Sequence, residues 1–453
     1  MRKKYYYHLV MFLLSIAIVV AAFHHSENEN LSMLIGQIIM VTSCFLILYL
    51  FLYFFRNEVL QVARKTLFIN LTVLLFIIAT SLIPDRQGMI IYLIPFAIIP
   101  MVITTFFDAR LALFILLVTI MMAGFMVPEP FEFVFLTFIS GVVAIFSITN
   151  IYRRAKFLFS AMMVIITYSA LYFAITLLKG ESIDVIDWTE YKWFAVNGIL
   201  ILFCYPVIFL FEKKFYFLSD TTLLELSDSN QPLLRRLSED APGSFQHSLQ
   251  VSNIAEEAAR KIGANSLMVR TGALYHDIGK IVNPEYFIEN QSEGLSPHDK
   301  LDSLSSAKVI IGHVSKGVEM AKKYKLPIQI IDFIRTHHGT TTAYFFYKKF
   351  LDGNPRKSDM KNEFVYPGPK PFSKETAIVM MADAVEASSR SVGNYSEENI
   401  RELVERIIYL QEMDGQFSGV PLTFKDISEI KDVFIKRLTN IYHVRIAYPE
   451  REP

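Results

Sequence analysis

The stretch Tyr275-His276-Asp277-Ile278-Gly279-Lys280 joins an imidazole to a carboxylate on consecutive residues. Both side chains are good ligands for a divalent metal. Successive helical residues point about 100° apart, so a helix that carries both ligands would lie across a metal site. Gly279 is expected to end this helix, and Lys280 adds a cation beside whatever the metals hold. Taken alone, the pair is weak evidence for a metal site, because it usually represents a surface helix residue followed by a cap.

Composition divides the chain into two halves. The chain has 453 residues, 53% of them hydrophobic, and a formal net charge of 0. The apolar residues concentrate before about residue 211, and the charged and Gly- or Pro-containing stretches follow. This pattern predicts a membrane half and a soluble half of roughly 240 residues, enough for one hydrophobic core. The balanced charge offers no basic surface for nucleic acid, so no nucleic-acid polymer is expected as a partner.

The two cysteines restrict the chemistry of the soluble half. Cys44 and Cys204 both lie inside apolar runs. They provide no disulfide framework outside the membrane and no thiolate ligand in the soluble half. Metal ligands there must therefore be histidines and aspartates.

Eight apolar runs precede residue 212, and most are long enough to cross a lipid bilayer as helices. They cover about residues 9–23, 33–54, 67–83, 89–107, 109–127, 131–151, 158–178 and 193–211. The first is shorter and ends near Ala21-Ala22, so a signal peptide is an alternative to the uncleaved span that we favour. We predict a transmembrane domain over residues 1–212, with a first span and then seven more. Asn70 and Asn197 in these spans suggest hydrogen bonds between helices.

The positive charges predict an orientation. Lysines and arginines cluster at residues 2–4, 56–65, 110, 153–156 and 213–214, whereas the alternate connections hold only Arg86, Lys179 and Lys192. Basic connections remain on the cytoplasmic side of a membrane. The N-terminus and everything after Glu212 are therefore predicted to be cytoplasmic. His24-His25, on an outer connection, is better explained as a solvated pair than as a metal site.

The soluble half is predicted to be entirely helical. A leucine-patterned connector covers residues 213–241, Pro242-Gly243 ends it, and Ser244 is expected to cap the next helix. Helices are expected over about residues 245–263, 266–278, 304–324, 327–338, 373–391, 397–406 and 423–443. Ser373 is a second expected cap, and Thr423 with Asp426 resembles a capping box. We assign residues 242–447 to one domain and 448–453 to a tail. The loop 352–372 looks too polar for the core and is expected to border the active site.

Further ligand types recur along the soluble half in a fixed order. Besides His276 and Asp277, the expected helices or helix ends carry His247, His313, His337, His338 and Asp383. Asp383 interrupts an apolar run, where an unpaired carboxylate would be costly. Seven ligands suit two octahedral metals when one carboxylate bridges them. Five imidazoles favour Fe or Mn over Mg, which prefers oxygen. The set therefore predicts a dinuclear metal site, although any one of these residues alone would be explained as an ordinary core or surface residue.

This order of ligands, H…HD…H…HH…D, resembles that of the HD-domain metallophosphohydrolases. The similarity is greater to the membrane-anchored seven-transmembrane HD proteins of the PgpH type, which hydrolyse cyclic di-AMP. Its motifs occupy residues 222–228, 241–249, 275–280, 297–300, 337–341, 366–370 and 382–387. The resemblance implies an all-α protein, with a polytopic helical membrane domain followed by a cytoplasmic all-helical HD domain. The chain departs from the family at one point. Proteins of this type usually carry a large external domain between the first span and the next, and here only about residues 24–32 stand in that place.

The resemblance also implies a role for each residue. One metal would be held by His247, His276, Asp277 and Asp383, and the other by His313, His337, His338 and the bridging Asp277. Two such metals bind a phosphodiester oxygen and activate water near neutral pH. Lys280 would neutralise phosphate charge, with a structural ion pair as its alternative. Opening the cyclic di-AMP ring in this way gives linear pApA. Arg390 is a candidate for contacting phosphate or nucleobase, with a surface salt bridge as its alternative.

The implied setting is the bacterial cytoplasmic membrane, with the catalytic domain facing the cytoplasm and a homodimer as the expected assembly. Three other functions stay open. A cyclic di-GMP phosphodiesterase of the HD-GYP kind is disfavoured, because His337-His338 continues into Gly339-Thr340-Thr341 and not toward Gly-Tyr-Pro. A phosphohydrolase acting on another nucleotide is the second. A membrane receptor that only binds nucleotide is the third; it would have lost metal ligands, and none is missing.

Overall fold

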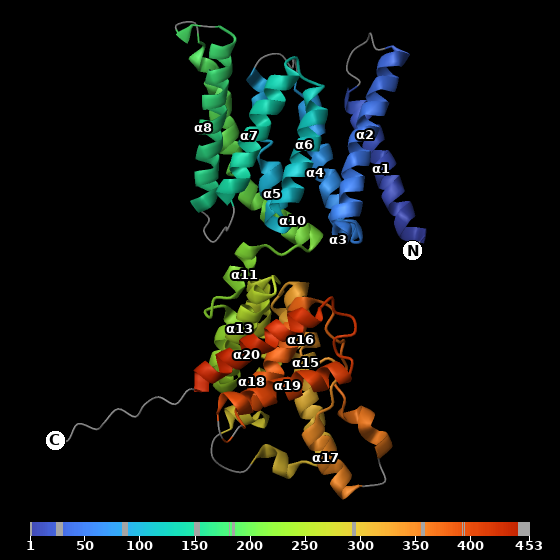
Figure 1. The fold of residues 1–453 in the computed structure, drawn as a ribbon, viewed down its shortest axis with the longest axis vertical. Coiled ribbons are helices and arrows are strands. Elements are labelled where there is room, and N and C mark those ends of the chain that lie inside the picture. The colour runs from blue at the N-terminus through green and yellow to red at the C-terminus, as the bar shows by residue number, and fades with distance from the viewer. Residues whose placement is uncertain are drawn as a thin grey trace, which may run out of the picture. The chain divides into compact units, whose positions relative to one another are not determined.

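The protein, seen in a computed structural model, is described over residues 2–23, 30–83, 89–148, 155–180, 182–183, 186–291, 296–354, 358–391, 393 and 395–442. These residues form helices and no strand, with one isolated bridge between Thr342 and Val365. The chain divides into two compact units, Met1–Thr221 and Thr222–Pro453 (Figure 1). The all-α prediction is confirmed. The predicted tail 448–453 and the pair His24-His25 lie outside the described residues.

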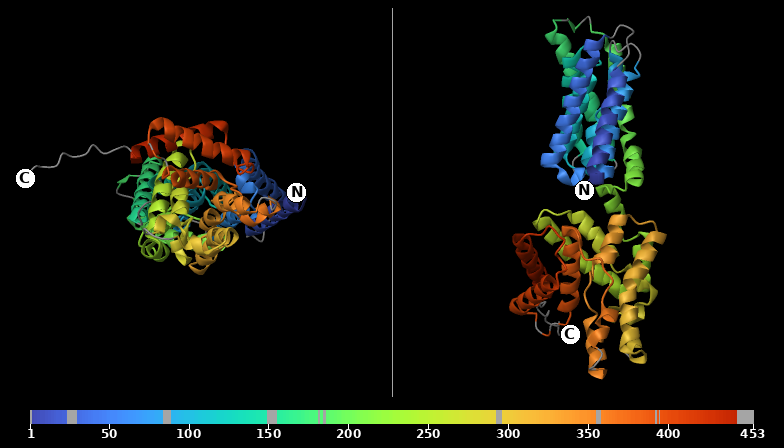
Figure 2. Two further views of the ribbon diagram at one scale, coloured as in Figure 1. Left: turned by 90° about the horizontal axis from the view of Figure 1, so that it is seen from below. Right: turned by 90° about the vertical axis from the view of Figure 1, so that its right-hand side faces the viewer.

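The first unit is a bundle of apolar helices (Figure 2). They are α1 (Arg2–Phe23), α2 (Leu31–Phe55), α3 (Asn57–Leu60), α4 (Ala63–Ser81), η1 (Met89–Leu93), α5 (Ile98–Phe106), α6 (Ala109–Gly124), α7 (Pro130–Ile148), α8 (Ala155–Leu178), η3 (Trp188–Tyr191), α9 (Lys192–Ile201) and α10 (Cys204–Phe215). Six helical segments are long and apolar enough to cross a membrane, and two shorter apolar helices accompany them. Large apolar side chains such as Phe54 and Phe146 are exposed, as lipid contact requires. The chain is therefore a multi-pass membrane protein.

Two of the eight apolar runs are interrupted helices, where we expected continuous spans. The run 89–107 consists of η1 and α5 with a break around Pro95, and the run 193–211 consists of α9 and α10 with a break at Leu202–Phe203. Proline has no N–H to donate and disfavours helical geometry in the residue before it. Pro95 therefore accounts for the first break. Pro206, in the first turn of α10, accounts for the second, because it cannot donate to the carbonyl of Leu202.

Asn197 ties the two interrupted runs together. Its side-chain amide, on α9, donates to the carbonyl oxygens of Tyr92 (2.6 Å) and Ile94 (3.1 Å) beside the first break. The break removes the helical partners of these carbonyls, and Asn197 supplies a donor to both, while Ile94 also accepts from the amide of Phe96 at 2.9 Å. Asn70 acts similarly, because it accepts a hydrogen bond from Ser15 of α1 at 3.3 Å. Both asparagines thus join different helices, as the sequence predicted.

The second unit packs its helices around α13, α14 and α18. It contains α11 (Asp220–Leu226), α12 (Pro232–Asp240), α13 (Pro242–Lys261), α14 (Ser266–Tyr275), η4 (Ile278–Val282), η5 (Pro284–Tyr286), η6 (Ile288–Asn290), η7 (Pro297–Lys300), α15 (Ser303–Lys323), α16 (Ile328–Thr336), α17 (Tyr344–Gly353), η8 (Ser358–Phe364), α18 (Lys374–Ser389), α19 (Glu397–Met413) and α20 (Phe424–Tyr442). The buried face of α13 carries Val251, Ile254, Ala255 and Ala258. These residues recur at helical spacing, which is why this helix becomes central.

The start of α13 differs from the prediction. Its N-cap is Ala241 and Pro242 lies in its first turn, so Pro242-Gly243 begins the helix. Proline suits this position because a first-turn N–H has no helical partner and proline has none to offer. Ser244 is not the cap: it lies inside the helix, and its hydroxyl donates to Glu289 Oε1 at 2.8 Å.

Other predicted boundaries are confirmed or corrected. Ser373 caps α18, and its side chain exchanges hydrogen bonds with Thr376 in a capping box. The predicted box of Thr423 and Asp426 is also present, with backbone amides donating to Asp426 Oδ2 (2.9 Å) and Thr423 Oγ1 (3.1 Å). The loop 352–372 was wrongly excluded from the core, because Phe364 is fully buried against α15 and α17.

Candidate metal centre

Seven side chains from five helices or helix ends meet in the second unit. His247 lies on α13, His276 and Asp277 follow α14, His313 lies on α15, His337 and His338 follow α16, and Asp383 lies on α18. All are buried except His338, whose side chain is 26% exposed. They form three overlapping groups in which the potential ligand atoms lie within 4.8 Å of one another. The fold thus brings together all seven residues that the sequence singled out.

Asp277 stands between two sets of histidines. Its Oδ2 lies 3.2 Å from His276 Nε2 and 3.7 Å from His247 Nε2. Its Oδ1 lies 3.3 Å from His313 Nε2 and 3.6 Å from His337 Nε2. Each carboxylate oxygen therefore faces a different pair of imidazoles. This is the geometry in which one carboxylate can bridge two metal ions.

Asp383 completes the first set. Its Oδ1 lies 2.9 Å from His247 Nε2 and 3.6 Å from His276 Nε2. Its Oδ2 lies 3.8 Å from His338 Nδ1, on the side of the second set. The buried carboxylate that interrupts the apolar stretch of α18 thus has imidazole partners, as its position in the sequence required.

The orientation of the histidines fits a metal. The Nδ1 atoms of His276, His313 and His337 lie 2.6, 2.5 and 2.8 Å from the carbonyl oxygens of Ala273, Ile310 and Ile334. A carbonyl only accepts, so each Nδ1 carries a proton, and each Nε2 offers a lone pair to a metal when the ring is neutral. The Nε2 atoms of His313 and His337 nevertheless face each other at 3.0 Å. Two lone pairs at that distance repel unless a cation lies beside them. His276 Nε2 is also buried without a hydrogen-bond partner among the described residues.

The electrostatic field of the cluster favours positive charge. Burial opposes ionisation of Asp277, but His276 and Lys280 hold the pKa of its carboxyl well below the usual value. Burial lowers the pKa of His337 well below its usual value, which keeps that imidazole neutral. His276 shows the opposite balance: burial lowers its pKa, but Asp277 and Asp383 outweigh burial and raise the pKa to about 10. A site of carboxylates that draws a proton onto a buried imidazole also attracts a metal cation.

Glu386 is a functional residue that the sequence reasoning missed. Its carboxylate makes a short hydrogen bond to His247 Nδ1, and it is buried on α18, one turn after Asp383. Such a carboxylate fixes the imidazole with Nε2 directed at the metal and raises its basicity. The sequence held a signal for it, because Glu386 is a second acid in the apolar stretch that drew attention to Asp383.

Arg390 lies near this pair. Its guanidinium contacts Glu386 Oε1 at 2.7 Å, and its side chain is 38% exposed. It also lines a cavity of about 400 Å³ that adjoins the ligand cluster. The salt bridge that was the alternative for Arg390 is thus present, and the same residue faces the space beside the metal ligands.

Lys280 is buried between two carboxylates. Its Nζ lies 2.7 Å from Asp277 Oδ2 and 2.8 Å from Glu289 Oε1. Burial lowers the pKa of Lys280, but the two carboxylates outweigh burial and raise it above the usual value, so the amine stays charged. Glu289 was also missed, because it lies on η6 in a stretch with no periodic pattern. Lys280 lines the same cavity as Arg390.

The cavity is lined by both polar and apolar side chains. The ligand residues His247, His338 and Asp383 line it, and Met380, Ile407 and Leu410 form the apolar part of its wall. Tyr366, from the loop 352–372, contacts the His338 ring, with the ring centroids 4.2 Å apart and the planes tilted by 31°. The loop therefore reaches the ligand cluster, as predicted.

Comparison with known proteins agrees with this geometry. The family model described as a 7TM receptor with intracellular HD hydrolase matches residues 31–219, and the HD domain model matches residues 244–388. The cyclic-di-AMP phosphodiesterase PgpH of Bacillus subtilis (strain 168) is 35% identical over 446 residues, which make up 94% of this chain. The chain therefore resembles the PgpH type of HD-domain membrane proteins in both halves.

Two further PgpH-type matches come from Listeria monocytogenes. Its cyclic-di-AMP phosphodiesterase PgpH is 39% identical over 317 residues, 69% of this chain. The crystal structure of its HD domain in complex with cyclic-di-AMP is 43% identical and covers 48% of this chain and 100% of that one, with a TM-score of 0.46. The chain spans only 61% and 44% of the lengths of the Bacillus and Listeria proteins.

Proposed function

We propose that this protein is a membrane-bound, metal-dependent phosphodiesterase that hydrolyses cyclic di-AMP to linear pApA. The observation that carries the proposal is Asp277, whose two oxygens face separate histidine pairs at 3.2–3.7 Å inside a buried cluster. The relatives named as cyclic-di-AMP phosphodiesterases support the choice of substrate. The reaction would lower the amount of this messenger in the cytoplasm.

The seven clustered residues would hold two divalent metals, with Fe or Mn favoured by the five imidazoles. When bound, two such metals supply Lewis acidity toward a phosphodiester and a water acidic enough to act as the nucleophile near neutral pH. One metal would be bound by His247, His276 and Asp383. The other would be bound by His313, His337 and His338, and Asp277 would bind both. Glu386 holds His247 in the tautomer that ligation needs.

Lys280 and Arg390 would bind the substrate. Both line the cavity beside the ligand cluster. The ammonium of Lys280, which already contacts Asp277 and Glu289, would also contact a substrate phosphate. Its positive charge would offset the negative charge that develops on the phosphate oxygens. Arg390, anchored by Glu386, presents its remaining guanidinium donors to a second phosphate or to a nucleobase. The apolar wall of Met380, Ile407 and Leu410 suits the face of an adenine ring.

The membrane half would anchor this reaction at the bacterial cytoplasmic membrane. The distribution of lysine and arginine supports a cytoplasmic second unit, where a cyclic dinucleotide messenger occurs. We propose residues 1–212 as the transmembrane domain, 213–241 as the connector and 242–447 as the HD domain, with a homodimer as the functional assembly.

Hydrolysis by the detergent-solubilised full chain tests the proposal. The protein is incubated with Mn²⁺ or Fe²⁺ and with cyclic di-AMP, and the products are separated by chromatography. We expect linear pApA from cyclic di-AMP and much slower turnover of cyclic di-GMP. Asp277→Ala should abolish turnover and bound metal, whereas Asp432→Ala, an exposed acid on α20, should retain both.

Two outcomes would contradict the proposal. Cyclic di-AMP that remains intact under every metal and redox condition would exclude the activity. Full turnover by Asp277→Ala would exclude the bridging role, even if the activity itself were real.

A further inference from the structure

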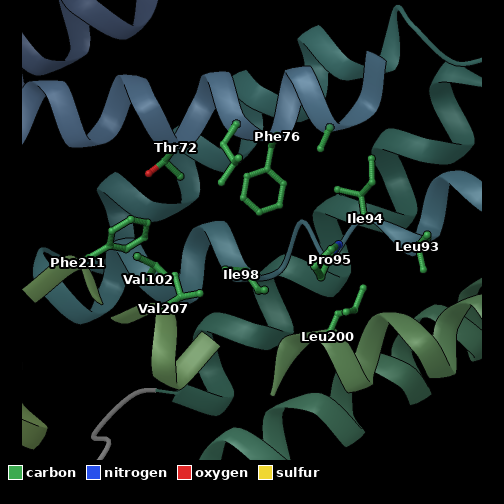
Figure 3. Close-up of a pocket in the computed structure, with 12 residues that line it drawn as sticks. Thr72, Phe76, Leu93, Ile94, Pro95, Ile98, Val102, Leu200, Val207 and Phe211 are labelled. Carbon is green, nitrogen blue, oxygen red and sulfur yellow. The ribbon is translucent and has the colours of Figure 1, made fainter. Parts of the chain in front are cut away.

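The membrane half contains a cavity of about 360 Å³ with an apolar wall. Figure 3 shows Thr72 and Phe76 of α4 facing the same space as Ile98 of α5 and Val207 of α10. Leu200, from the end of α9, lies on its border. The only lining residue with a polar side chain is Thr72, and its hydroxyl already donates to the carbonyl of Phe68 at 2.9 Å. No polar atom is exposed on the cavity wall, so the wall offers an occupant only hydrocarbon surface.

The cavity arises from the two interrupted helices. Leu93, Ile94 and Pro95, at the break between η1 and α5, line it, and so do residues on both sides of the break between α9 and α10. Asn197 holds the first break in place through its bonds to Tyr92 and Ile94. The space is therefore built by fixed backbone. In membrane proteins, interrupted helices of this kind are typical of binding sites.

Its size suits an alkyl chain. An apolar cavity of about 150 Å³ holds a benzene-sized guest. The present cavity, at about 360 Å³, is more than twice as large and so accommodates on the order of ten carbons. The surrounding solvent of this unit is lipid, so acyl chains are the hydrocarbon available to it.

Two lysines lie on the helices that line the cavity, one near the start of α4 and one near the end of α10. Lys65 precedes Thr72 by seven residues, so the two share a face of α4 at a separation of about 10 Å. Lys214 follows Val207 by seven residues and has the same relation on α10. The ring of Phe68 on α4 contacts the rings of Phe211 (5.0 Å) and Phe215 (5.1 Å), so these two helix ends meet.

Lys214 is exposed, whereas Lys65 is partly buried and its ammonium lies 5.9 Å from the centroid of the Phe107 ring. Neither forms an ion pair with an acid among the residues that the structure describes in this unit. An ammonium beside an apolar cavity at a helix end is the arrangement that binds the head group of an anionic lipid. The cations and the cavity wall together therefore select an occupant with a negative head and a hydrocarbon tail.

We propose that this cavity is a binding site for an anionic phospholipid, with one acyl chain between α4, α5 and α10 and the phosphate beside Lys65 and Lys214. An occupied cavity would stabilise the break between η1 and α5 through contacts that an empty one lacks.

Native mass spectrometry of the full chain tests the charge requirement. The protein is titrated with phosphatidylglycerol or with phosphatidylcholine of the same acyl chains. We expect one phosphatidylglycerol to bind more tightly than any phosphatidylcholine. Lys65→Gln combined with Lys214→Gln should weaken this binding about thirtyfold, since each cation near an anionic lipid contributes about fivefold. Lys192→Gln is the matched control, because it removes a cation more than two turns before Leu200, the nearest lining residue on its helix.

A cavity-filling variant tests the position of the acyl chain. Ala79→Trp places an indole in the cavity and should abolish tight phosphatidylglycerol binding, whereas Ile78→Trp, at an exposed neighbour outside the lining, should leave it unchanged. Leu200→Phe serves as the second filling variant if Ala79→Trp does not fold. Equal affinity for the two lipids, or unchanged binding in the folded filling variant, overturns the proposal.

Discussion

Replacing Gly279 by alanine is expected to remove at least one metal from the metal centre while the protein stays folded. A Cβ at this position would lie 1.8 Å from the carbonyl oxygen of His313 and 2.7 Å from the amide nitrogen of Gly317, well inside ordinary contact near 3.4 Å. Both obstacles are backbone atoms, so η4 and α15 must separate by roughly 1.5 Å to regain van der Waals contact. The separation carries Asp277 away from His313, whose Nε2 is now 3.3 Å from Oδ1.

The size of the effect follows from that movement. A misplacement of about 1 Å at a reacting centre costs about a hundredfold in rate. The overpacking itself destabilises the fold by about 1–3 kcal/mol, which most domains tolerate. We therefore expect Gly279→Ala to lose at least one metal and about two orders of magnitude in hydrolysis, as measured by elemental analysis and product chromatography. The unfolding midpoint should fall only moderately.

Gly312→Ala is the matched control for this prediction. It lies on α15 beside His313, but an added Cβ meets no atom within 4 Å. Alanine is favoured over glycine within a helix by about 1 kcal/mol. The control should keep its metals and rate and unfold slightly later. If Gly279→Ala retains two metals and full turnover, the close backbone contact does not position Asp277, and the reasoning fails.

Three further predictions concern the second unit. Glu386→Ala should weaken metal binding about 10–100-fold in competition with a chelator, because His247 loses its Nδ1 partner, and Glu386→Gln should restore part of the affinity. Ser373→Ala should lower the free energy of unfolding by about 1 kcal/mol, measured by denaturant titration, because α18 loses its cap. Asp426 has its pKa lowered by a hydrogen bond from Lys374, so its contribution to stability is present above its unfolded pKa near 3.8 and is lost as the pH falls below it. Asp426→Asn should remove this part of the acid dependence of the unfolding midpoint; an unchanged dependence would refute the assignment.

The ligand residues could be predicted from the sequence because their chemistry is costly without partners. A carboxylate such as Asp383 in an apolar helix, and adjacent histidines at helix ends, need a shared explanation, and a metal supplies it. Helix starts such as Ser373 could be predicted for a similar reason. A hydroxyl at this position accepts a hydrogen bond from a backbone amide only three residues later. Local chemistry of this kind does not depend on the rest of the fold.

The partners of those residues could not be predicted, because they depend on distant packing. Glu289 approaches Lys280 only after η6 folds against α13. The two elements pack so closely there that a Cβ added at Gly243 would lie 1.8 Å from the carbonyl oxygen of Glu289. The burial of Phe364 likewise follows from contacts with α15 and α17, which the polar and proline-rich sequence around it does not indicate. In the membrane half, hydrophobicity revealed the spans, but the carbonyls that Asn197 satisfies became visible only in three dimensions.

The end of α14 explains how one His-Asp pair serves both histidine sets. We expected a helix through residue 278, which would separate the two side chains by about 100° around a continuing axis. The helix instead stops at Tyr275, and Asp277 adopts φ −106° and ψ 13°, in the bridge region that is common at active sites. The turn into η4 lets Asp277 direct its two oxygens at different imidazoles, with Oδ2 toward His276 and Oδ1 toward His313. The bridge therefore depends on a local backbone conformation, which the contact between Gly279 and His313 holds in place. A substitution that restored helix at Asp277 would be expected to disturb both sets together, even with every ligand retained.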